Sequence, residues 1–252
     1  MKTGDLIAAL DLPASARLDR RIPKKLLLEH GAPTATDKRH INEGIEELFW
    51  VAALKPTTIG VPEYRDAMRE YLEIAVLRCT LRAAARVTRL VELVHRAVPY
   101  PLLLVTESDG EVGFSVAHKR WALNEAEKTV LDGEVVAANW ELGSVPPQLE
   151  AFRKALALER QPHGTLHSLY QGWIDTLHAF QAARLTGCFT PAADEERATA
   201  RQDALRECAR LETEMARLRA AAEKEKQMAR RVELNLALKR IEAARASAIA
   251  KL

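Results

Sequence analysis

The sequence has few aromatic residues (5%) and only three cysteines among its 252 residues. Cys79, Cys188 and Cys208 are odd in number, widely spaced and without a CxxC pattern, which argues against a disulfide framework or a structural zinc site. Charge of one sign is also lacking. With 37 Lys+Arg against 35 Asp+Glu, the formal net charge of +2 is not the basic field of a dedicated nucleic-acid binder. A hydrophobic fraction of 48% excludes a chain that is disordered throughout.

Long hydrophobic runs and familiar catalytic motifs are missing as well. No stretch approaches the roughly 18 to 20 apolar residues of a membrane span. The short apolar stretch at the N-terminus is interrupted by Asp5 and Asp11, so we expect a cytoplasmic protein without a signal peptide. The sequence contains no GxxxxGK[ST], HExxH or GxSxG motif and no GxGxxG after a strand. We therefore expect a protein that is not an enzyme, with no catalytic residues, metal or cofactor.

The first part of the chain mixes β-rich runs with an amphipathic helix. Residues 47–61 and 71–82 are rich in apolar and β-branched residues, which predicts two strands. Residues 87–98 place apolar side chains at three- and four-residue steps, which predicts a helix ended by Pro99. Two further β-rich runs flank Asp109-Gly110, a dipeptide that favours a hairpin turn.

These elements together indicate an α+β fold. Another strand is expected at residues 130–142, which contain a second turn candidate, Asp132-Gly133. Hairpins with a single intervening helix predict a mostly antiparallel sheet with flanking helices on one face, in a domain at residues 1–147. Residues 148–190 form a helical extension expected to pack on this domain.

The C-terminal domain, residues 191–252, is predicted to be a long helix. From Asp194 onward the chain has no proline or glycine, and its 59 residues would make a rod of about 85–90 Å. A seam with alternating steps of four and three residues runs along it, as in a coiled coil. The seam is weak, because Glu225 lies within it, and it needs a partner chain or a return helix. Its large members are predicted to drive oligomerisation: Leu211, Met215, Leu218, Val232 and Leu236.

Two groups of cations are candidate contacts for nucleic acid or a protein partner. The N-terminal group could bind phosphates, dock on an acidic protein surface or remain a solvated arm, and it consists of Arg17, Arg20, Arg21, Lys24 and Lys25. The second group places cations beside an aromatic ring and consists of His118, Lys119, Arg120 and Trp121. An ordinary strand with alternating faces is the favoured explanation of the second group.

Acidic residues near strand ends raise the alternative of a metal-dependent nuclease. Such a site needs carboxylates, usually with a lysine, that hold Mg²⁺ against the scissile phosphate. The available residues are Glu46, Glu47, Asp66, Glu73 and Glu107, with Lys55 or Lys119. None of these acids forms an acid-x-Lys pair on a central strand. His163 and His167 are four residues apart, with His178 eleven residues further on, but two histidines without a nearby acid or cysteine make an incomplete metal site.

The order of motifs resembles a prokaryotic family, domain of unknown function 4391, over residues 15–185. The similar features are a basic entry, a Lys-Pro step after a Trp-containing strand, a Pro-Tyr-Pro strand start and a lysine-ending strand. They lie at Ile22-Pro23-Lys24, Leu54-Lys55-Pro56-Thr57-Thr58-Ile59, Val98-Pro99-Tyr100-Pro101 and Ala117-His118-Lys119. The resemblance implies genes beside helicases and DNA methyltransferases in restriction-like or phage-defence clusters. It supplies no catalytic residues.

We therefore expect a non-catalytic accessory or scaffold subunit of a bacterial antiviral-defence or restriction-modification-like complex. It would dock a helicase or methyltransferase partner, with nucleic acid as a further ligand, and would form homo-oligomers through its C-terminal helix. Two alternatives stay open: a divergent metal-dependent nuclease, and a single-stranded nucleic-acid binder that uses Arg20, Arg21, Lys119, Arg120 and Trp121.

Overall fold

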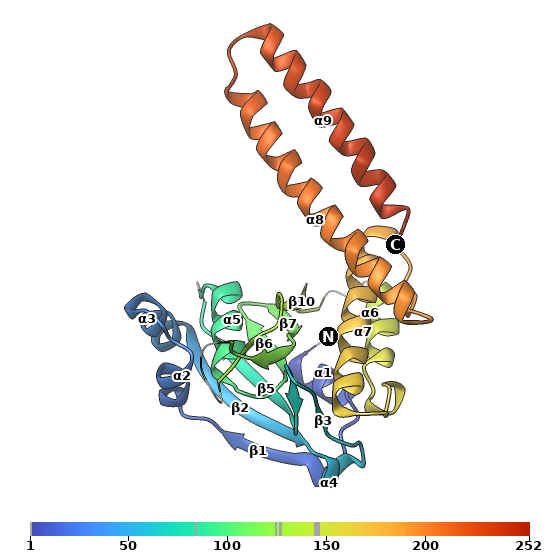
Figure 1. Ribbon diagram of the computed structural model, residues 1–252. Helices are drawn as coiled ribbons and strands as arrows, with labels where there is room; N and C mark the ends of the chain where they lie inside the picture. Colours follow the sequence, from blue (N-terminus) through green and yellow to red (C-terminus); the bar gives the residue numbers. More distant parts are fainter. Residues whose placement is uncertain (1, 84, 124, 126–127, 144–146) are drawn as a thin grey trace. The chain divides into compact units, whose positions relative to one another are not determined.

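The computed structural model describes residues 2–83, 85–123, 125, 128–143 and 147–252 (Figure 1). The chain forms two compact units, Met1–Leu177 and His178–Leu252, and the division falls inside helix α7 (Leu166–Thr186). The described residues include no helix with the length and apolar character that a membrane crossing requires.

A six-stranded sheet organises the first unit. Its strands, in spatial order, are β1 (Arg17–Arg21), β2 (Ile45–Leu54), β5 (Ile74–Leu81), β6 (Leu102–Ser108), β7 (Glu111–Val116) and β10 (Val136–Glu141). Every neighbouring pair is antiparallel except β5 and β6, which are parallel and are joined through helix α5 (Val87–Ala97). Asp109 and Gly110, with φ of 35° and 82°, form the predicted turn between β6 and β7. The α+β prediction is confirmed.

Helices cover both faces of this sheet (Figure 1), and the prediction that they lie on one face is wrong. Helices α2 (Lys24–His30), α3 (Ala35–Gly44) and α5 pack on the face that carries Leu77 and Leu104. The opposite face carries Phe114. Its ring centroid lies 6.4 Å from that of Phe152, on α6 (Pro147–Ala155). Helix α1 (Thr3–Ala9) also contacts this face, where the Thr3 hydroxyl donates a hydrogen bond to the Glu107 carboxylate of β6. Both faces are apolar at the centre of the sheet, so both must be buried.

Two small hairpins extend the first unit. Strands β3 (Tyr64–Arg65) and β4 (Glu70–Tyr71) form one, and β8 (Lys119–Trp121) and β9 (Thr129–Leu131) form the other. The single strand expected at residues 130–142 is therefore two strands, β9 and β10. Gly133, with φ of 88°, lies between them and lets the chain leave the small sheet for the large one. The remaining short helices are α4 (Pro56–Ile59), η1 (Ala14–Ala16) and η2 (Leu158–Arg160).

The second unit is a helical hairpin and not one continuous rod. Helix α8 (Glu195–Lys224) begins where the Asp194 side chain accepts a hydrogen bond from the Arg197 amide at 2.8 Å. The chain reverses at residues 225–227, and α9 (Met228–Ile249) returns antiparallel to α8 (Figure 1). The sequence predicted that the weak seam needs either a partner chain or a return helix. Helix α9 is that return helix. The long helical C-terminal segment is confirmed, with a break near Glu225.

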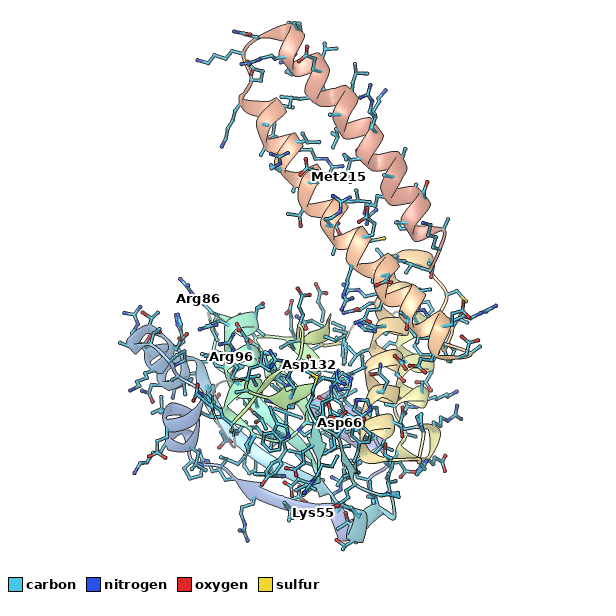
Figure 2. All side chains as sticks on the ribbon, in the orientation of Figure 1. Lys55, Asp66, Arg86, Arg96, Asp132 and Met215 are labelled. Carbon is cyan, nitrogen blue, oxygen red and sulfur yellow. The ribbon has the colours of Figure 1, made fainter. Side chains whose placement is uncertain are left out.

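The hairpin buries much of the predicted seam. Leu211, Met215 and Leu218 are all buried on α8, and Met215 lies between the two helices (Figure 2). Leu211 belongs to a core cluster with Cys208 and Ala248. Arg219–Glu242 and Arg245–Glu212 ion pairs, at 3.0 and 3.8 Å, link the helices further along. Turning back lets α8 cover its apolar residues without a second chain.

Candidate functional site

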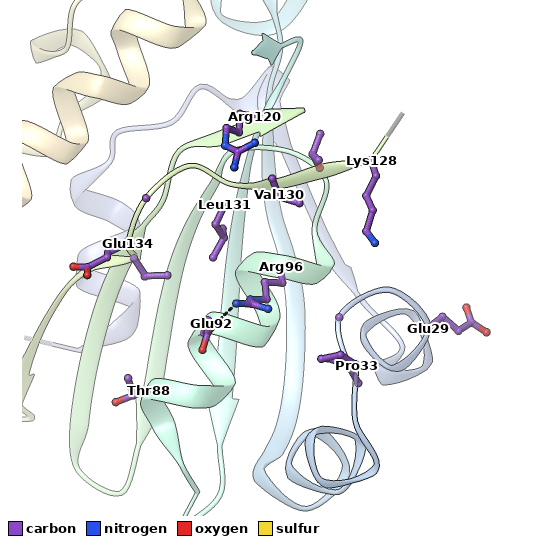
Figure 3. Close-up of a pocket in the computed structure, with 15 residues that line it drawn as sticks. Glu29, Pro33, Thr88, Glu92, Arg96, Arg120, Lys128, Val130, Leu131 and Glu134 are labelled. Carbon is purple, nitrogen blue, oxygen red and sulfur yellow. Dashed lines mark ion pairs between the residues drawn. The ribbon is translucent and has the colours of Figure 1, made fainter. Parts of the chain in front are cut away.

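A groove of about 920 Å³ lies between helix α5, the turn after α2 and the β8–β9 hairpin (Figure 3). This volume falls in the range of sites that bind small molecules or short peptide segments. Strand β9 forms one wall and the turn that leads from it to β10 continues that wall. The lining residues are Glu29, Gly31, Ala32, Pro33, Thr88, Glu92, Arg96, Arg120, Lys128, Thr129, Val130, Leu131, Gly133, Glu134 and Val135.

The cations of this groove are already neutralised by carboxylates. Three pairs form within 4 Å: Arg96–Glu92 at 2.7 Å, Lys128–Glu125 at 2.7 Å and Arg120–Asp132 at 3.7 Å. Figure 3 shows the Arg96–Glu92 pair on α5. A phosphate would have to compete with these carboxylates, so the groove is better suited to a protein surface of mixed polarity than to a nucleic acid.

Strand β9 presents an unpaired edge. The amide of Asp132 donates to the carbonyl of His118 and that of Ala122 to the carbonyl of Lys128, both at 2.8 Å. Bonded and non-bonded pairs alternate in an antiparallel ladder. The backbone groups of Thr129 and Leu131 therefore point away from β8. An extended segment of another chain can pair with such an edge.

Lys119 begins strand β8, and its side chain points toward the end of α5 and not into solvent. It is 1% exposed, and its ammonium donates to the carbonyls of His95 and Val98 at the C-terminal end of α5, the second at 2.8 Å. Burial lowers the pKa of Lys119 to about 7. Its expected role as a surface contact for nucleic acid is therefore not supported, because the ammonium is held by the protein. It fixes the hairpin to α5 instead.

His95 makes this interior unusually polar. It is fully buried on α5, and its Nε2 lies 3.0 Å from the hydroxyl of Ser115. The Nδ1 atom has no hydrogen-bond partner among the described residues. Burial, together with the neighbouring Lys119, lowers the pKa of His95 to about 3, so the imidazole is neutral.

His118 is also engaged within the protein. Gln171 donates its amide to Asp175 at 2.9 Å, so its oxygen accepts from His118 Nε2 at 2.8 Å. Nδ1 must then accept from the Tyr71 hydroxyl. The ring stacks on His167 with 5.1 Å between centroids. Burial lowers the pKa of His118 to about 4, so it is neutral and joins β4, β8 and α7.

Arg120 and Trp121 are half-buried, as is His118, whereas Lys119 is buried. The Trp121 amide donates to the Met68 carbonyl at 2.8 Å, which ties β8 to the β3–β4 hairpin. The four predicted contact residues therefore do not form one surface: His118 and Lys119 hold elements together, while Arg120 faces the groove.

The N-terminal cations lie on and beside the edge strand β1. Arg20 and Arg21 are exposed, and Arg21 pairs with Glu47 at 3.3 Å. Lys25 pairs with Glu29 at 3.7 Å. The remaining two are half-buried, and the Lys24 ammonium donates to backbone carbonyls near the start of β2, whereas Arg17 lies at a bulge in β1. Arg20 is exposed and has no ion pair within the described residues.

The acids considered for a nuclease do not come together. Glu73 pairs with Lys55 at 3.0 Å, and Glu107 accepts from Thr3. Asp66 accepts the amides of Met68 and Arg69 at 2.7 and 2.6 Å and so shapes the β3–β4 turn. No group of three potential metal-ligating side chains occurs within the described ranges.

The last candidate surface is the face of α9 that points away from α8. Val232 and Leu236, predicted to oligomerise, are 50% and 53% exposed, and Met228 on the same face is 66% exposed. Sequence reasoning missed Met228, although its spacing of four residues from Val232 could have identified it. It also missed the groove, because the groove joins three segments that are distant in sequence and no local pattern marks it.

Comparison with known proteins agrees with the family resemblance that the order of motifs indicates. No curated protein and no solved structure matches the chain. One family model, described as a domain of unknown function, matches residues 10–244, which includes both the sheet and most of the helical hairpin. The chain therefore belongs to the DUF4391 family.

Proposed function

We propose that this protein is a non-catalytic accessory subunit of a phage-defence or restriction-modification-like DNA-processing complex. It self-associates through the outer face of α9 and docks a helicase or methyltransferase partner at the groove beside β9. The observation that carries the proposal is that α9 has two apolar faces. One packs on α8, and the other leaves Met228, Val232 and Leu236 in solvent.

An exposed row of large apolar side chains is costly for a helix that has only to pack on α8. Contiguous apolar surface of this kind marks contact with another protein. The paired charges of the groove and the free edge of β9 support a protein partner there, since an extended segment would gain backbone hydrogen bonds without displacing a salt bridge.

Light scattering coupled to size-exclusion chromatography tests self-association. The full-length chain is expected to show a concentration-dependent mass above 28.1 kDa. Leu236→Glu should give a monomer, because a carboxylate would be buried in the contact. Leu123→Glu is the matched control, since Leu123 is 83% exposed in the other unit, and it should leave the mass unchanged. Helical circular dichroism should stay equal in all three. A monomeric wild-type chain at every concentration would overturn self-association.

Two assays test the non-catalytic part of the proposal. Incubation with double- and single-stranded DNA and Mg²⁺ should yield no cleavage, and cleavage abolished by Glu73→Ala would replace the proposal with a nuclease. Fluorescence anisotropy with single-stranded DNA should show weak binding. Tight binding that falls steeply with salt and is lost in Arg20→Ala would instead identify a nucleic-acid binder.

Mixing the purified chain with a purified helicase or methyltransferase encoded beside it tests the partner. A complex should form in analytical ultracentrifugation. Leu131→Pro should weaken it, because proline removes an amide from the free edge of β9. Leu131→Ala, which shortens the same side chain but keeps the amide, is the matched control. A complex unaffected by Leu131→Pro would place the partner elsewhere, and no complex with either protein would contradict the assignment.

A further inference from the structure

The free edge of β9 determines what kind of molecule fits beside it. The N–H and C=O groups of Thr129 and Leu131 point away from β8, and both residues line the groove. Backbone donors and acceptors at this spacing are matched by the backbone of another extended chain. A helix bonds its own backbone groups internally and has few to offer such an edge. The edge therefore favours an extended segment.

Strand β9 also lacks the features that protect another strand edge. Strand β1, at the edge of the large sheet, reads RLDRR, and its register is irregular between Arg17 and Arg20. Within it Asp19 has a φ of 46°. Charged side chains and bulges of this kind hinder the pairing of a further strand. Strand β9 reads TVL, without charge and with a regular register against β8, so a second chain can pair with it.

The register of the hairpin fixes which side chains of an added segment face the protein. Leu131 lies opposite Lys119, whose ammonium donates to the Val98 carbonyl at 2.8 Å. Thr129 lies on the same face, and its hydroxyl donates to the Pro99 carbonyl at 3.0 Å. Directly opposed side chains of neighbouring strands share one face of a sheet. Segment residues opposite Leu131 and Thr129 would therefore point toward the C-terminal end of α5.

Two kinds of side chain fit along the groove. Its half-buried apolar lining consists of Ala32, Leu131 and Val135. Glu134 is exposed at the opposite end of the groove from Lys128 (Figure 3), and it has no ion pair within the described residues. The other two carboxylates of the lining, Glu29 and Glu92, are paired with Lys25 and Arg96. The groove thus complements apolar side chains and, at the Glu134 end, a cation.

We propose that a short segment of the partner protein adds to β9 as an antiparallel strand and carries a basic residue followed by two alternating apolar residues. The inference rests on the partner docking proposed above and adds its mode of recognition. The first apolar residue lies opposite Leu131 and the second opposite Thr129. Each exchanges two backbone hydrogen bonds with its counterpart. The basic residue precedes them in the segment and therefore lies toward Glu134.

The antiparallel orientation follows from the small number of backbone groups on this edge. Two residues of an antiparallel segment bond all four groups of Thr129 and Leu131. A parallel segment would need three residues for the same four bonds, and these would be slanted and slightly less stable. The short edge therefore favours the antiparallel segment.

Amide hydrogen exchange resolved to single residues tests strand addition in the full chain. Without a ligand, the Thr129 and Leu131 amides should exchange fast and the Val130 amide slowly, because only the Val130 amide points toward β8. The probe is the peptide acetyl-Gly-Arg-Ser-Val-Thr-Val-Ser-Gly-amide. At saturation it should slow exchange at Thr129 and Leu131 by about tenfold and leave Val130 unchanged. N-methylation of both valines removes two donors and should abolish this protection. Unchanged exchange at Thr129 and Leu131 with the unmethylated probe would overturn strand addition.

Charge exchange at Glu134 tests the orientation. Glu134→Lys should raise the Kd of the probe by about fivefold, because an ion pair becomes a like-charge contact. A probe with glutamate in place of arginine should bind this variant more tightly than it binds the wild type. Glu63→Lys, exposed and outside the groove lining, is the matched control and should leave both Kd values unchanged. If only a probe with arginine after the valines responds to Glu134→Lys, the antiparallel orientation is wrong.

The exchange measurement also separates this inference from the proposed partner. A complex with the helicase or methyltransferase that leaves the Thr129 and Leu131 amides unprotected would overturn strand addition and leave the docking function intact. Protection by the probe without a complex with either enzyme would support strand addition and contradict the assigned partner.

Discussion

Lys119 allows the packing beneath the β8–β9 hairpin to be tested by its proton affinity. The side chain is 1% exposed, and it has no carboxylate partner among the described residues. Burial lowers its pKa from 10.5 to about 7. The perturbation is Lys119→Met, which keeps a long unbranched side chain and removes the titrating group.

The magnitude follows from the difference in proton binding between the two states. Between pH 7 and pH 10 the unfolded chain keeps the Lys119 proton and the folded chain has released it. The unfolded state then binds more protons, so the free energy of unfolding rises with pH in this window. At 1.36 kcal/mol for each pKa unit, the rise from pH 7 to pH 9 is about 2 kcal/mol. Well below pH 7 both states hold the proton, and this contribution is constant.

Urea unfolding followed by tryptophan emission measures this effect in the first unit alone. All four tryptophans lie within Met1–Leu177. We expect the wild-type minus Lys119→Met difference in unfolding free energy to increase by about 2 kcal/mol from pH 7 to pH 9. Met also leaves two carbonyls without their ammonium, which shifts the variant by a constant amount, so the pH dependence is the readout. Lys154→Met, with a side chain 63% exposed, is the matched control. Parallel pH profiles for wild type and Lys119→Met would refute the reasoning.

Three further predictions concern the same fold. Gly113→Ala should lower the unfolding free energy by about 1–3 kcal/mol in the same urea assay, because the new Cβ would lie 2.4 Å from the Thr106 hydroxyl; an unchanged midpoint would contradict this packing. The pKa of Asp37 is lowered to about 2 by hydrogen bonds from Arg89, so its stabilising effect is lost as pH falls from about 4 to 2, and Asp37→Asn should flatten the acid unfolding curve there. A thiol reagent should modify one cysteine, Cys188, in the native chain and three after denaturation, since Cys79 and Cys208 are buried; native modification of two would exclude this packing.

Local patterns predicted the elements that local forces decide. Asp109-Gly110 identified its hairpin, because few dipeptides accept two positive φ values. The apolar spacing of residues 87–98 identified α5, and the α+β class followed from these elements. The reversal at residues 225–227 could not be predicted from the absence of proline and glycine, since a short helix–helix connection does not need them.

The candidate sites were harder to predict because they depend on tertiary contacts. Lys119 looks like a surface cation in the sequence, and only the C-terminal carbonyls of α5 make its burial tolerable. Val232 and Leu236 were assigned to the same seam as Leu211 and Met215. The fold separates them, since α8 uses its part of the seam within the hairpin and α9 leaves its part exposed.

The single parallel contact in the large sheet has a consequence for folding kinetics. Strands β1, β2 and β5 form one antiparallel half, and β6, β7 and β10 form the other. Only the β5–β6 ladder joins the halves, and α5 must cross over before that ladder can form. Each half can form its own contacts first, while joining them requires closure of the longer connection. Substitutions in α5 that weaken its packing, such as Leu93→Ala, should therefore slow folding more than equally destabilising ones in the β6–β7 turn.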